Sequence, residues 1–287
     1  MEDGDSVGNG LKLSIITVSY NAAETIEQAI QSVTMQSYEN IEYIVIDGGS
    51  NDGTLDIVRK YEKKIAYWIS EPDDGIYDAM NKGIRAATGD YIYFLGADDC
   101  LLQRTIIEKV MSFLDEKPDI LSAGVYLVDE ELKVERYMDG MFAKNHKQFN
   151  GLMIPHQGMV VCRTLLEENK FDLKYKIAAD YDFFLKCYLN KNITFLFCAF
   201  PVAYYSSGGV STRSYESNNE YVAIMEKYHL PGKVISYVKH RFNKPWKQKM
   251  KTLLRKFGLM KTLLIMKGAE KHTCAWATCR WCGKKDN

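Results

Sequence analysis

The first hundred residues alternate between short β-branched runs and segments of helical periodicity, which limits the folds open to the chain. Hydrophobic runs typical of buried strands occupy residues 13–19, 41–46, 65–69 and 91–95. Between them, apolar residues recur at spacings of three and four, as in Ile26, Ala29, Ile30 and Val33. Strands that alternate with helices predict an α/β fold, with a mainly parallel central sheet flanked by helices.

Beyond residue 100 the pattern loosens. It predicts helices at 103–114 and 180–189, a hairpin of strands 120–128 and 133–138, and two further strands at 193–197 and 199–205. Asn21 and Glu24 resemble a capping box at the start of the first helix. We expect a disordered tail at 1–10, an α/β domain at 11–212 with halves 11–100 and 101–212, and a helical extension at 213–287.

The zero net charge conceals two oppositely charged parts. Residues 231–287 carry 15 Lys and Arg against 2 acidic residues, and the preceding 230 carry 22 basic and 35 acidic residues. An acidic body suits a metal site, and a basic tail suits an anionic surface. No run approaches the ~20 apolar residues of a membrane span. The cysteines in apolar segments predict buried thiols in a reducing compartment, so we expect a cytoplasmic protein.

Polar side chains follow three of the predicted strands, where each strand ends. Thr17, Tyr20 and Asn21 come at the end of the first, Asp47 ends the second, and the pair Asp98 and Asp99 follows the fourth. Ligands of open α/β sheets bind beyond the carboxyl ends of the strands, so these groups predict a nucleotide site. The loop after Asp47 is no EF-hand, because Asp52 stands where that motif needs glycine, and dinucleotide and P-loop glycine motifs are absent from the sequence.

Several segments resemble the successive blocks of family 2 glycosyltransferases of the GT-A fold. They are SIITVSYN at 14–21, DGGSNDGT at 47–54, NKGI at 81–84 and GDYIYFLGADD at 89–99. EPDDGIYDAMN at 71–81 resembles a subgroup that builds bacterial cell-surface polysaccharides such as colanic acid and O-antigens. The resemblance covers about residues 11–210. It implies an inverting, metal-dependent enzyme that moves a sugar from a nucleotide-diphosphate donor to a hydroxyl of a saccharide or lipid-linked saccharide.

The resemblance also implies roles for single residues on the donor side. Residues 11–100 would form the nucleotide-binding half, and 101–212 the acceptor-binding half. Asp99 would bind Mn²⁺ or Mg²⁺ together with Asp98, which also reaches the ribose or sugar, and His156 is a further candidate ligand. Ala97 replaces an acidic residue usual in this motif, so protein ligation of the metal would rest mainly on Asp99. The nucleotide and donor sugar would be held by Thr17, Tyr20, Asn21, Asp47, Asp74, Asp78, Asn81 and Lys82.

The general base is expected from a different part of the chain, across the sugar from the metal. ADYDFFLK at 179–186 resembles the family's acidic motif at the start of the acceptor-side helix, where Asp180 matches the base. Asp182 is the second candidate. A purely structural Asp180, capping the helix, is the competing interpretation.

The basic tail carries two further patterns. Trp246, Met250, Leu253, Leu254 and Phe257 form one apolar helical face flanked by cations, which favours an anionic membrane surface on the inner side of the cell membrane over nucleic acid. A helix packed on the catalytic domain is the alternative. His272, Cys274, Cys279 and Cys282 offer zinc ligands at an unusual spacing, and unligated thiols remain the simpler interpretation.

Two rival functions remain open at the level of sequence. A metal-dependent nucleotidyltransferase also uses an α/β sheet and an acidic pair, but it releases pyrophosphate instead of a nucleoside diphosphate. A non-catalytic, membrane-tethered module that binds nucleotide sugars would show no turnover and would tolerate loss of Asp180.

Overall fold

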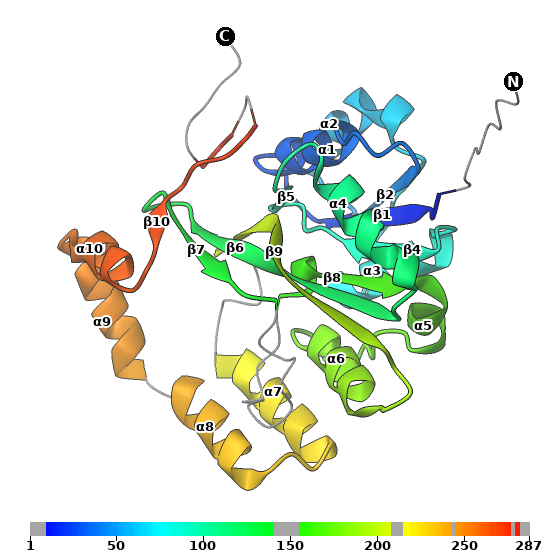
Figure 1. Cartoon of the computed structure of the whole chain (residues 1–287). Helices are drawn as coiled ribbons and strands as arrows, with labels where there is room; N and C mark the ends of the chain where they lie inside the picture. The colour runs from blue at the N-terminus through cyan, green and yellow to red at the C-terminus, as the bar shows by residue number, and fades with distance from the viewer. Residues whose placement is uncertain (1–9, 141–154, 208–214, 243–244, 277–278, 282–287) are drawn as a thin grey trace, which may run out of the picture.

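The computed structural model describes residues 10–140, 155–207, 215–242, 245–276 and 279–281. Their strands form one mixed sheet with the order β10-β7-β6-β8-β4-β1-β2-β3, and β9 pairs with both β6 and β5 (Figure 1). Two hydrophobic cores lie on its opposite faces. One is built with residues of helices α1, α2 and α4, and the other with residues of α3, α5 and α6. The α/β fold class is confirmed.

The N-terminal half of the sheet is parallel, as the alternating pattern predicts. β1 (Leu13–Ser19), β2 (Ile41–Asp47), β3 (Tyr67–Ser70) and β4 (Tyr91–Phe94) pair in the order β4-β1-β2-β3. The helices between them are α1 (Ile26–Thr34), α2 (Thr54–Lys60) and α3 (Ile76–Ala86), with a short 3₁₀ turn at Glu62–Lys64. The carboxyl ends of β1, β2 and β4 therefore meet at one edge.

The second half is largely antiparallel, so the sheet as a whole is mixed. β8 (Met159–Cys162) runs antiparallel to β4, and β6 (Ile120–Asp129) forms the predicted hairpin with β7 (Val134–Met138). β9 (Phe195–Ser206) is one strand where the sequence predicts two. Its pairing with β6 shifts register on both sides of Gly124, which lies opposite Pro201, and the extra residues are on β9, as in a β-bulge. β5 (Cys100–Leu101) pairs with β9.

The remaining helices of the catalytic half are α4 (Ile106–Phe113), α5 (Arg163–Glu168) and α6 (Ala179–Leu189), with 3₁₀ turns at Leu114–Glu116 and His156–Gly158. The predicted capping box is wrong. Helix α1 starts at Ile26, and its N-cap, Thr25, makes no side-chain cap hydrogen bond. Asn21 instead adopts a left-handed backbone (φ 48°) and accepts the backbone N–H of Asn51, so it fastens the two loops at the edge of the sheet.

Four helices precede a return to the sheet: α7 (Tyr215–Lys227), α8 (Gly232–Phe242), α9 (Pro245–Lys256) and α10 (Leu259–Met266). β10 (Glu270–Lys271) then pairs antiparallel with β7 (Figure 1). Trp276 and Trp281 are buried in a sheet core. Among the described residues, no helix has the length and apolar character needed to cross a membrane.

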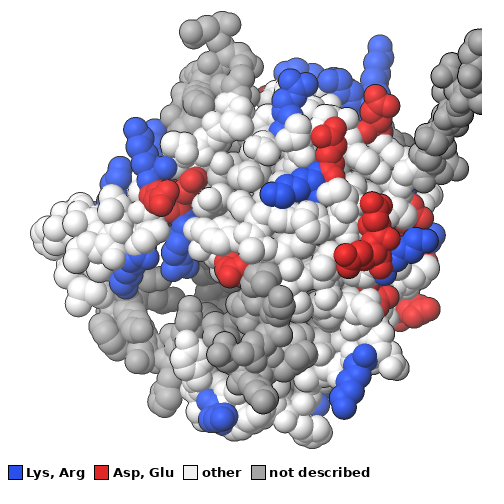
Figure 2. Space-filling model, in the orientation of Figure 1, with Lys and Arg blue, Asp and Glu red and all other residues white. Residues whose placement is uncertain are grey.

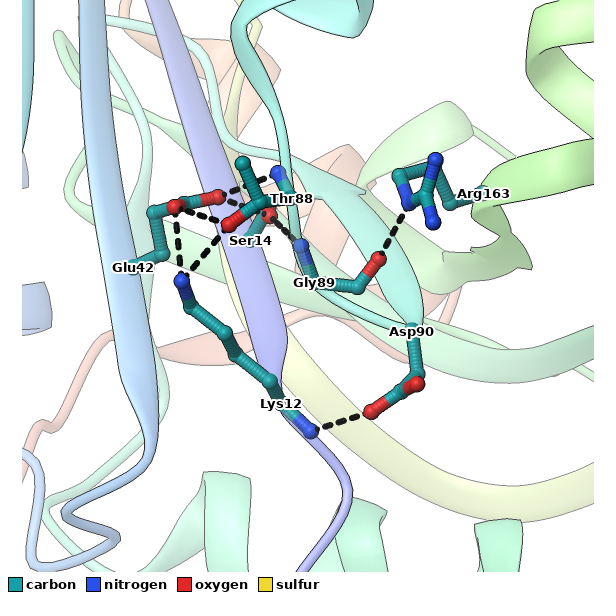
Figure 3. A network of polar contacts seen from close by, with 7 residues as sticks. All are labelled: Lys12, Ser14, Glu42, Thr88, Gly89, Asp90 and Arg163. Atoms are coloured by element: carbon teal, nitrogen blue, oxygen red, sulfur yellow. Dashed lines mark hydrogen bonds and ion pairs between the residues drawn. The ribbon is translucent and has the colours of Figure 1, made fainter.

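A polar network ties the starts of β1, β2 and β4 together at the opposite edge (Figure 3). Its centre is Glu42, which accepts hydrogen bonds from Lys12 Nζ (2.8 Å), Ser14 Oγ (2.6 Å) and the backbone and hydroxyl of Thr88 (2.7 and 2.6 Å). A Cβ on Gly89 would lie 2.7 Å from the backbone nitrogen of Ser14, so only glycine permits this approach. Burial alone raises the pKa of Glu42, but these donors outweigh it and lower the pKa to about 2.

We predict that Glu42→Gln lowers the free energy of unfolding by about 2–3 kcal/mol at neutral pH, because an amide cannot accept all four donors. Since the folded-state pKa is depressed, the wild-type contribution is present above about pH 4.5 and is lost as the pH falls towards about 2. Urea unfolding at several pH values measures both effects, with exposed Glu39→Gln as the control. Equal stability of Glu42→Gln and wild type at pH 7 would contradict the prediction.

Candidate active site

Asp47 organises the loop at the end of β2. Its carboxylate accepts hydrogen bonds from the hydroxyls of Ser19 (2.9 Å), Ser50 (2.5 Å) and Ser70 (2.7 Å) and from the backbone N–H groups of Gly49 and Ser50. Burial raises the pKa of Asp47, but the hydrogen bonds prevail and lower it, so the group is ionised at neutral pH. Because Asp47 is only 1% exposed, direct contact with a nucleobase would have to displace one of these donors.

The other residues predicted to bind the donor differ in their access to solvent. Tyr20 is 66% exposed at the rim of the same edge. Thr17 is fully buried, and its hydroxyl accepts a hydrogen bond from Tyr43 at 3.1 Å. Asn81 is also buried, and its amide bridges the N–H and C=O of Phe171 at 3.0 and 2.9 Å. Both side chains are buried and make internal hydrogen bonds, so their direct contact with the donor stays a prediction that would require the surrounding structure to open.

Asp98 and Asp99 follow β4 in a tight turn. Asp99 is 2% exposed, and its carboxylate accepts hydrogen bonds from Gln157 Nε2 (2.7 Å) and from the N–H groups of Ser206 (3.0 Å) and Gly96 (3.2 Å). Burial raises the pKa of Asp99 to about 7, and the charge of Asp98 adds to the rise. Burial also raises the pKa of Asp98, against the lowering effect of Arg280. Two adjacent carboxylates that resist ionisation fit a divalent cation, which would reverse both shifts.

Gln157 is a site residue that the sequence interpretation missed. Its Nε2 holds Asp99, whereas its Oε1 is buried without a hydrogen-bond partner among the described residues. The hydroxyl of Tyr93 donates to the Gln157 carbonyl at 2.7 Å and fixes the turn. A buried amide oxygen beside an acidic pair is a further oxygen ligand, or an acceptor for a water molecule, at the proposed cation site.

His156 connects the acidic pair to the candidate base. Its Nδ1 lies 3.3 Å from Asp180 Oδ2, and its charge lowers the pKa values of both Asp98 and Asp99, against the larger effect of burial. The three acidic residues come from the β4–β5 turn and from helix α6, which are about 80 positions apart in the sequence. His156 thus contacts the predicted base and acts electrostatically on the predicted metal ligands.

Asp180 lies in the first turn of α6 and is not the residue that caps it. The N-cap position is Ala178, and Glu220 of α7 accepts the N–H groups of Lys176, Ile177 and Ala178 at 2.8–2.9 Å. Asp180 instead accepts the hydroxyl of Tyr77 at 2.8 Å. Burial raises the pKa of Tyr77 well above its usual value, so Tyr77 remains a donor.

The second candidate base, Asp182, has a different environment. It is buried and forms an ion pair with Lys227 of α7, with 2.6 Å between Asp182 Oδ1 and Lys227 Nζ. Lys227 occupies an oxygen of Asp182, whereas Asp180 Oδ2 faces His156, so Asp180 is the candidate that lies on the His156 side.

The loop before α3 forms the rim between the two halves. Asp78 Oδ2 accepts the N–H of Asp74 at 3.3 Å, and the Asp74 carbonyl accepts Lys176 Nζ at 3.3 Å. Lys82 is paired with Glu71 (2.9 Å) and Asp78 (3.6 Å), so its charge is already offset within the loop. Lys82 thus shapes the acidic loop, and a direct phosphate contact would compete with these two pairs.

Arg280 reaches the acidic pair from the far end of the chain and has no precedent in the sequence interpretation. Its guanidinium donates to the carbonyl of Asp98 and pairs with Glu130 at 2.7 Å. Glu130 also accepts the indole N–H of Trp281 (3.0 Å) and the hydroxyl of Ser206 (2.9 Å). The only hint in the sequence was a cation between Cys279 and Trp281 in a segment with no other sign of packing.

Residues 14–169 match the family described as Glycosyl transferase family 2. The chain belongs to this family. It is 30% identical over 205 residues to a PGL/p-HBAD biosynthesis glycosyltransferase of Mycobacterium bovis. The aligned region covers 69% of this chain and 78% of the relative. It is also 33% identical over 180 residues to an uncharacterized glycosyltransferase of Mycobacterium tuberculosis, which covers 62% of this chain and 69% of that one. The enzyme is thus a glycosyltransferase that uses nucleotide sugars.

Solved structures support the GT-A fold. The chain superposes on S. aureus TarS 1–349 in complex with UDP-GlcNAc with a TM-score of 0.62 at 22% identity, over 85% of this chain and 71% of that one. It superposes equally well, at 18% identity, on a mannosyltransferase of Pyrobaculum calidifontis in complex with GDP-Man and Mn²⁺, over 90% and 79% of the two chains. At these identities the likeness establishes the fold alone.

We predict that Mn²⁺ affinity of the glycosyltransferase rises with pH up to about 7, since the metal binds the ionised form of Asp99, whose pKa is about 7. Below that value, affinity should fall roughly tenfold per pH unit. Electron paramagnetic resonance of free Mn²⁺ measures the Mn²⁺ affinity at each pH. Nucleotide is left out because its phosphates titrate in the same pH range. Asp99→Asn should lose the pH-dependent binding, whereas exposed Asp115→Asn should keep it. Affinity independent of pH below 7 would contradict the assignment.

Proposed function

We propose that this glycosyltransferase moves a sugar with inversion from a nucleoside-diphosphate sugar to an acceptor hydroxyl, with Asp180 as the general base. The observation that carries the proposal is the place of His156, whose Nδ1 lies 3.3 Å from Asp180 Oδ2 and whose electrostatic effect lowers the pKa values of Asp98 and Asp99. Inverting transfer needs a base and a leaving-group site on opposite faces of one sugar. The two groups belong to different elements, the β4–β5 turn and helix α6, and His156 interacts electrostatically with both.

The leaving-group side consists of Asp98, Asp99 and His156, with Gln157 behind them. These residues would hold Mn²⁺ or Mg²⁺, which offsets the charge that develops on the departing diphosphate. Few protein ligands are expected for such a cation, since phosphate oxygens and waters complete its shell. The Pyrobaculum mannosyltransferase, which shares the fold, is named with Mn²⁺ and its GDP-sugar, in agreement with this assignment.

The acceptor side consists of Asp180 and the groups that orient it. Tyr77 and the N–H of Tyr181 each donate to Oδ1 at 2.8 Å, which leaves Oδ2 directed towards His156. In the proposed step, Asp180 takes the proton of the acceptor hydroxyl as its oxygen bonds to the anomeric carbon. The bond from that carbon to the diphosphate breaks on the opposite face, and the nucleoside diphosphate leaves.

The donor nucleotide is proposed to lie along the edge formed by β1 and β2. The exposed ring of Tyr20 is suited to stack on a nucleobase, and the loop fixed by Asp47 and Asn21 lies beside it. Asp74 and Asp78 would face the donor sugar from the rim. Among the solved neighbours, TarS is named with UDP-GlcNAc and the mannosyltransferase with GDP-Man, so either uridine or guanosine diphosphate fits this fold.

The acceptor is proposed to be a lipid-linked saccharide in cell-surface polysaccharide synthesis, used at the inner face of the cytoplasmic membrane. Exposed apolar side chains on and between α9 and α10 support this: Met250 (44%), Leu253 (48%), Phe257 (65%), Leu259 (55%), Ile265 (51%) and Met266 (79%). Trp246, also expected on this surface, lies outside the described side chains. Lys and Arg side chains stand out over the same helices (Figure 2). An apolar patch edged with cations fits an anionic lipid surface.

Asp180→Asn is predicted to lower kcat by about 10²–10⁴-fold, because a carboxamide cannot take the hydroxyl proton. Binding of UDP or GDP in the presence of Mn²⁺ should not change, since the nucleotide contacts lie elsewhere. Release of nucleoside diphosphate from a panel of nucleotide sugars measures turnover, and release of pyrophosphate from nucleoside triphosphates tests for nucleotidyl transfer. The control is Asp172→Asn, an exposed carboxylate paired with Lys174. Wild-type turnover by Asp180→Asn would remove Asp180 from its proposed role.

Phe257→Asp and Met266→Asp are each predicted to weaken binding to vesicles of anionic lipid by about tenfold. Each replaces an exposed apolar side chain, which the membrane would bury, with a negative charge. Co-sedimentation at low and high salt measures binding. Leu189→Asp, at a 45% exposed apolar position at the end of α6, is the matched control. If all three variants bind as the wild type does, α9 and α10 do not form the membrane surface.

A further inference from the structure

Three side chains that bind soft metals meet near the C-terminus, and none of them is among the residues assigned to the donor or the acceptor. The ring nitrogens of His272 and the sulfur atoms of Cys274 and Cys279 provide ligand atoms that all lie within 4.8 Å of one another. His272 and Cys279 are 2% and 1% exposed, and both cysteines are thiols and not a disulfide. Imidazole with two thiols selects Zn²⁺ over the hard cations that bind nucleotides.

We propose that His272, Cys274 and Cys279 form a structural zinc site. A tetrahedral zinc with bonds of about 2.1 Å to nitrogen and 2.3 Å to sulfur places those two atoms about 3.6 Å apart. His272 Nε2 and Cys279 Sγ are 3.4 Å apart. Two sulfur ligands would lie about 3.8 Å apart, so a shift of about 1 Å brings the widest pair into range.

The surroundings of His272 match those of a metal ligand. Its Nδ1, the nitrogen turned away from Cys279, is hydrogen-bonded to Glu135 of β7 at 2.5 Å. Histidine ligands of zinc usually donate their second N–H to a carboxylate, which fixes the ring orientation and increases its basicity. Pairing of β10 with β7 sets this contact, since the backbone N–H of His272 also donates to the carbonyl of Lys133.

Cys282, which the sequence interpretation grouped with these residues, lies outside the described residues, and the proposed site is defined by His272, Cys274 and Cys279.

The site would fix the end of the chain against the catalytic domain. Arg280 and Trp281 directly follow Cys279, and both contact Glu130. Trp276, between the proposed ligands, donates its indole N–H to the carbonyl of Leu101 at 2.7 Å. A zinc ion at Cys279 would therefore hold Arg280 beside Asp98. The zinc proposal itself does not depend on the proposed transfer reaction.

Metal content of the purified full-length protein tests the proposal. We expect one zinc per chain after dialysis, and Co²⁺ substitution should give the visible absorption of tetrahedral cobalt–thiolate. Cys274→Ser and Cys279→Ser should lose the zinc and this spectrum. Cys162→Ser, which removes a half-buried thiol on β8, is the matched control and should keep both. If the wild-type protein holds no zinc in zinc-supplemented medium, or Cys279→Ser retains it, the site is wrong.

Hydrogen exchange tests the structural role on the wild-type protein, without relying on substitutions that could prevent folding. Removing zinc with a zinc-selective chelator, at saturating Mg²⁺, should increase exchange of residues 269–281 and leave β1–β4 protected. Adding Zn²⁺ back should restore protection. Equal exchange with and without the chelator would show that zinc does not hold this segment against the catalytic domain. That result would stand whether or not the protein transfers sugar.

Discussion

The burial of two neighbouring carboxylates beside the end of β4 is the constraint on which the site depends. Asp98 and Asp99 both have raised pKa values, which means that the folded protein opposes their charge. The N–H donors around Asp99 and the guanidinium of Arg280 offset only part of this cost. A site of this kind gains most from a cation that arrives with its substrate, because the metal and the diphosphate neutralise each other as they bind.

At the opposite edge of the same sheet, the hydrogen bonds to Glu42 stabilise the fold and offset the cost of the two buried carboxylates. Glu42 is also a nearly buried carboxylate on a parallel strand, yet its pKa falls to about 2 because Lys12, Ser14 and Thr88 surround it with donors. The contrast with Asp99 has two causes, since Asp99 is more deeply buried and Glu42 has more donors, one of them the Lys12 ammonium group. At one edge the donors stabilise the ionised carboxylate, and at the other the carboxylates remain costly to ionise until a cation binds. This division of roles is common in proteins with functional sites.

Local periodicity predicted the four parallel strands, the β6–β7 hairpin and the edge where Asp47, Asp98 and Asp99 gather. It could not predict which side chains remain available there. The amide of Asn81 is hydrogen-bonded to the backbone of Phe171, 90 positions away, and Asp182 is paired with Lys227, 45 positions away. Gln157 and Arg280 were missed for the same reason, since their roles come from contacts with Asp98 and Asp99 across the fold. Sequence spacing therefore located the site, and tertiary packing selected its members.

The predicted boundary near residue 213 follows composition, whereas packing divides the tail differently. Helices α9 and α10 expose apolar side chains, but residues 269–276 and 279–281 return to the sheet and bury Trp276, Cys279 and Trp281 in the core around β1, β5 and β9. The basic charge of the tail thus includes one cation, Arg280, that contacts the backbone of Asp98 in the candidate site. The chain passes through α9 and α10 before it reaches this position. The proposed attachment of these helices to a membrane would therefore act on a segment that is continuous with Arg280.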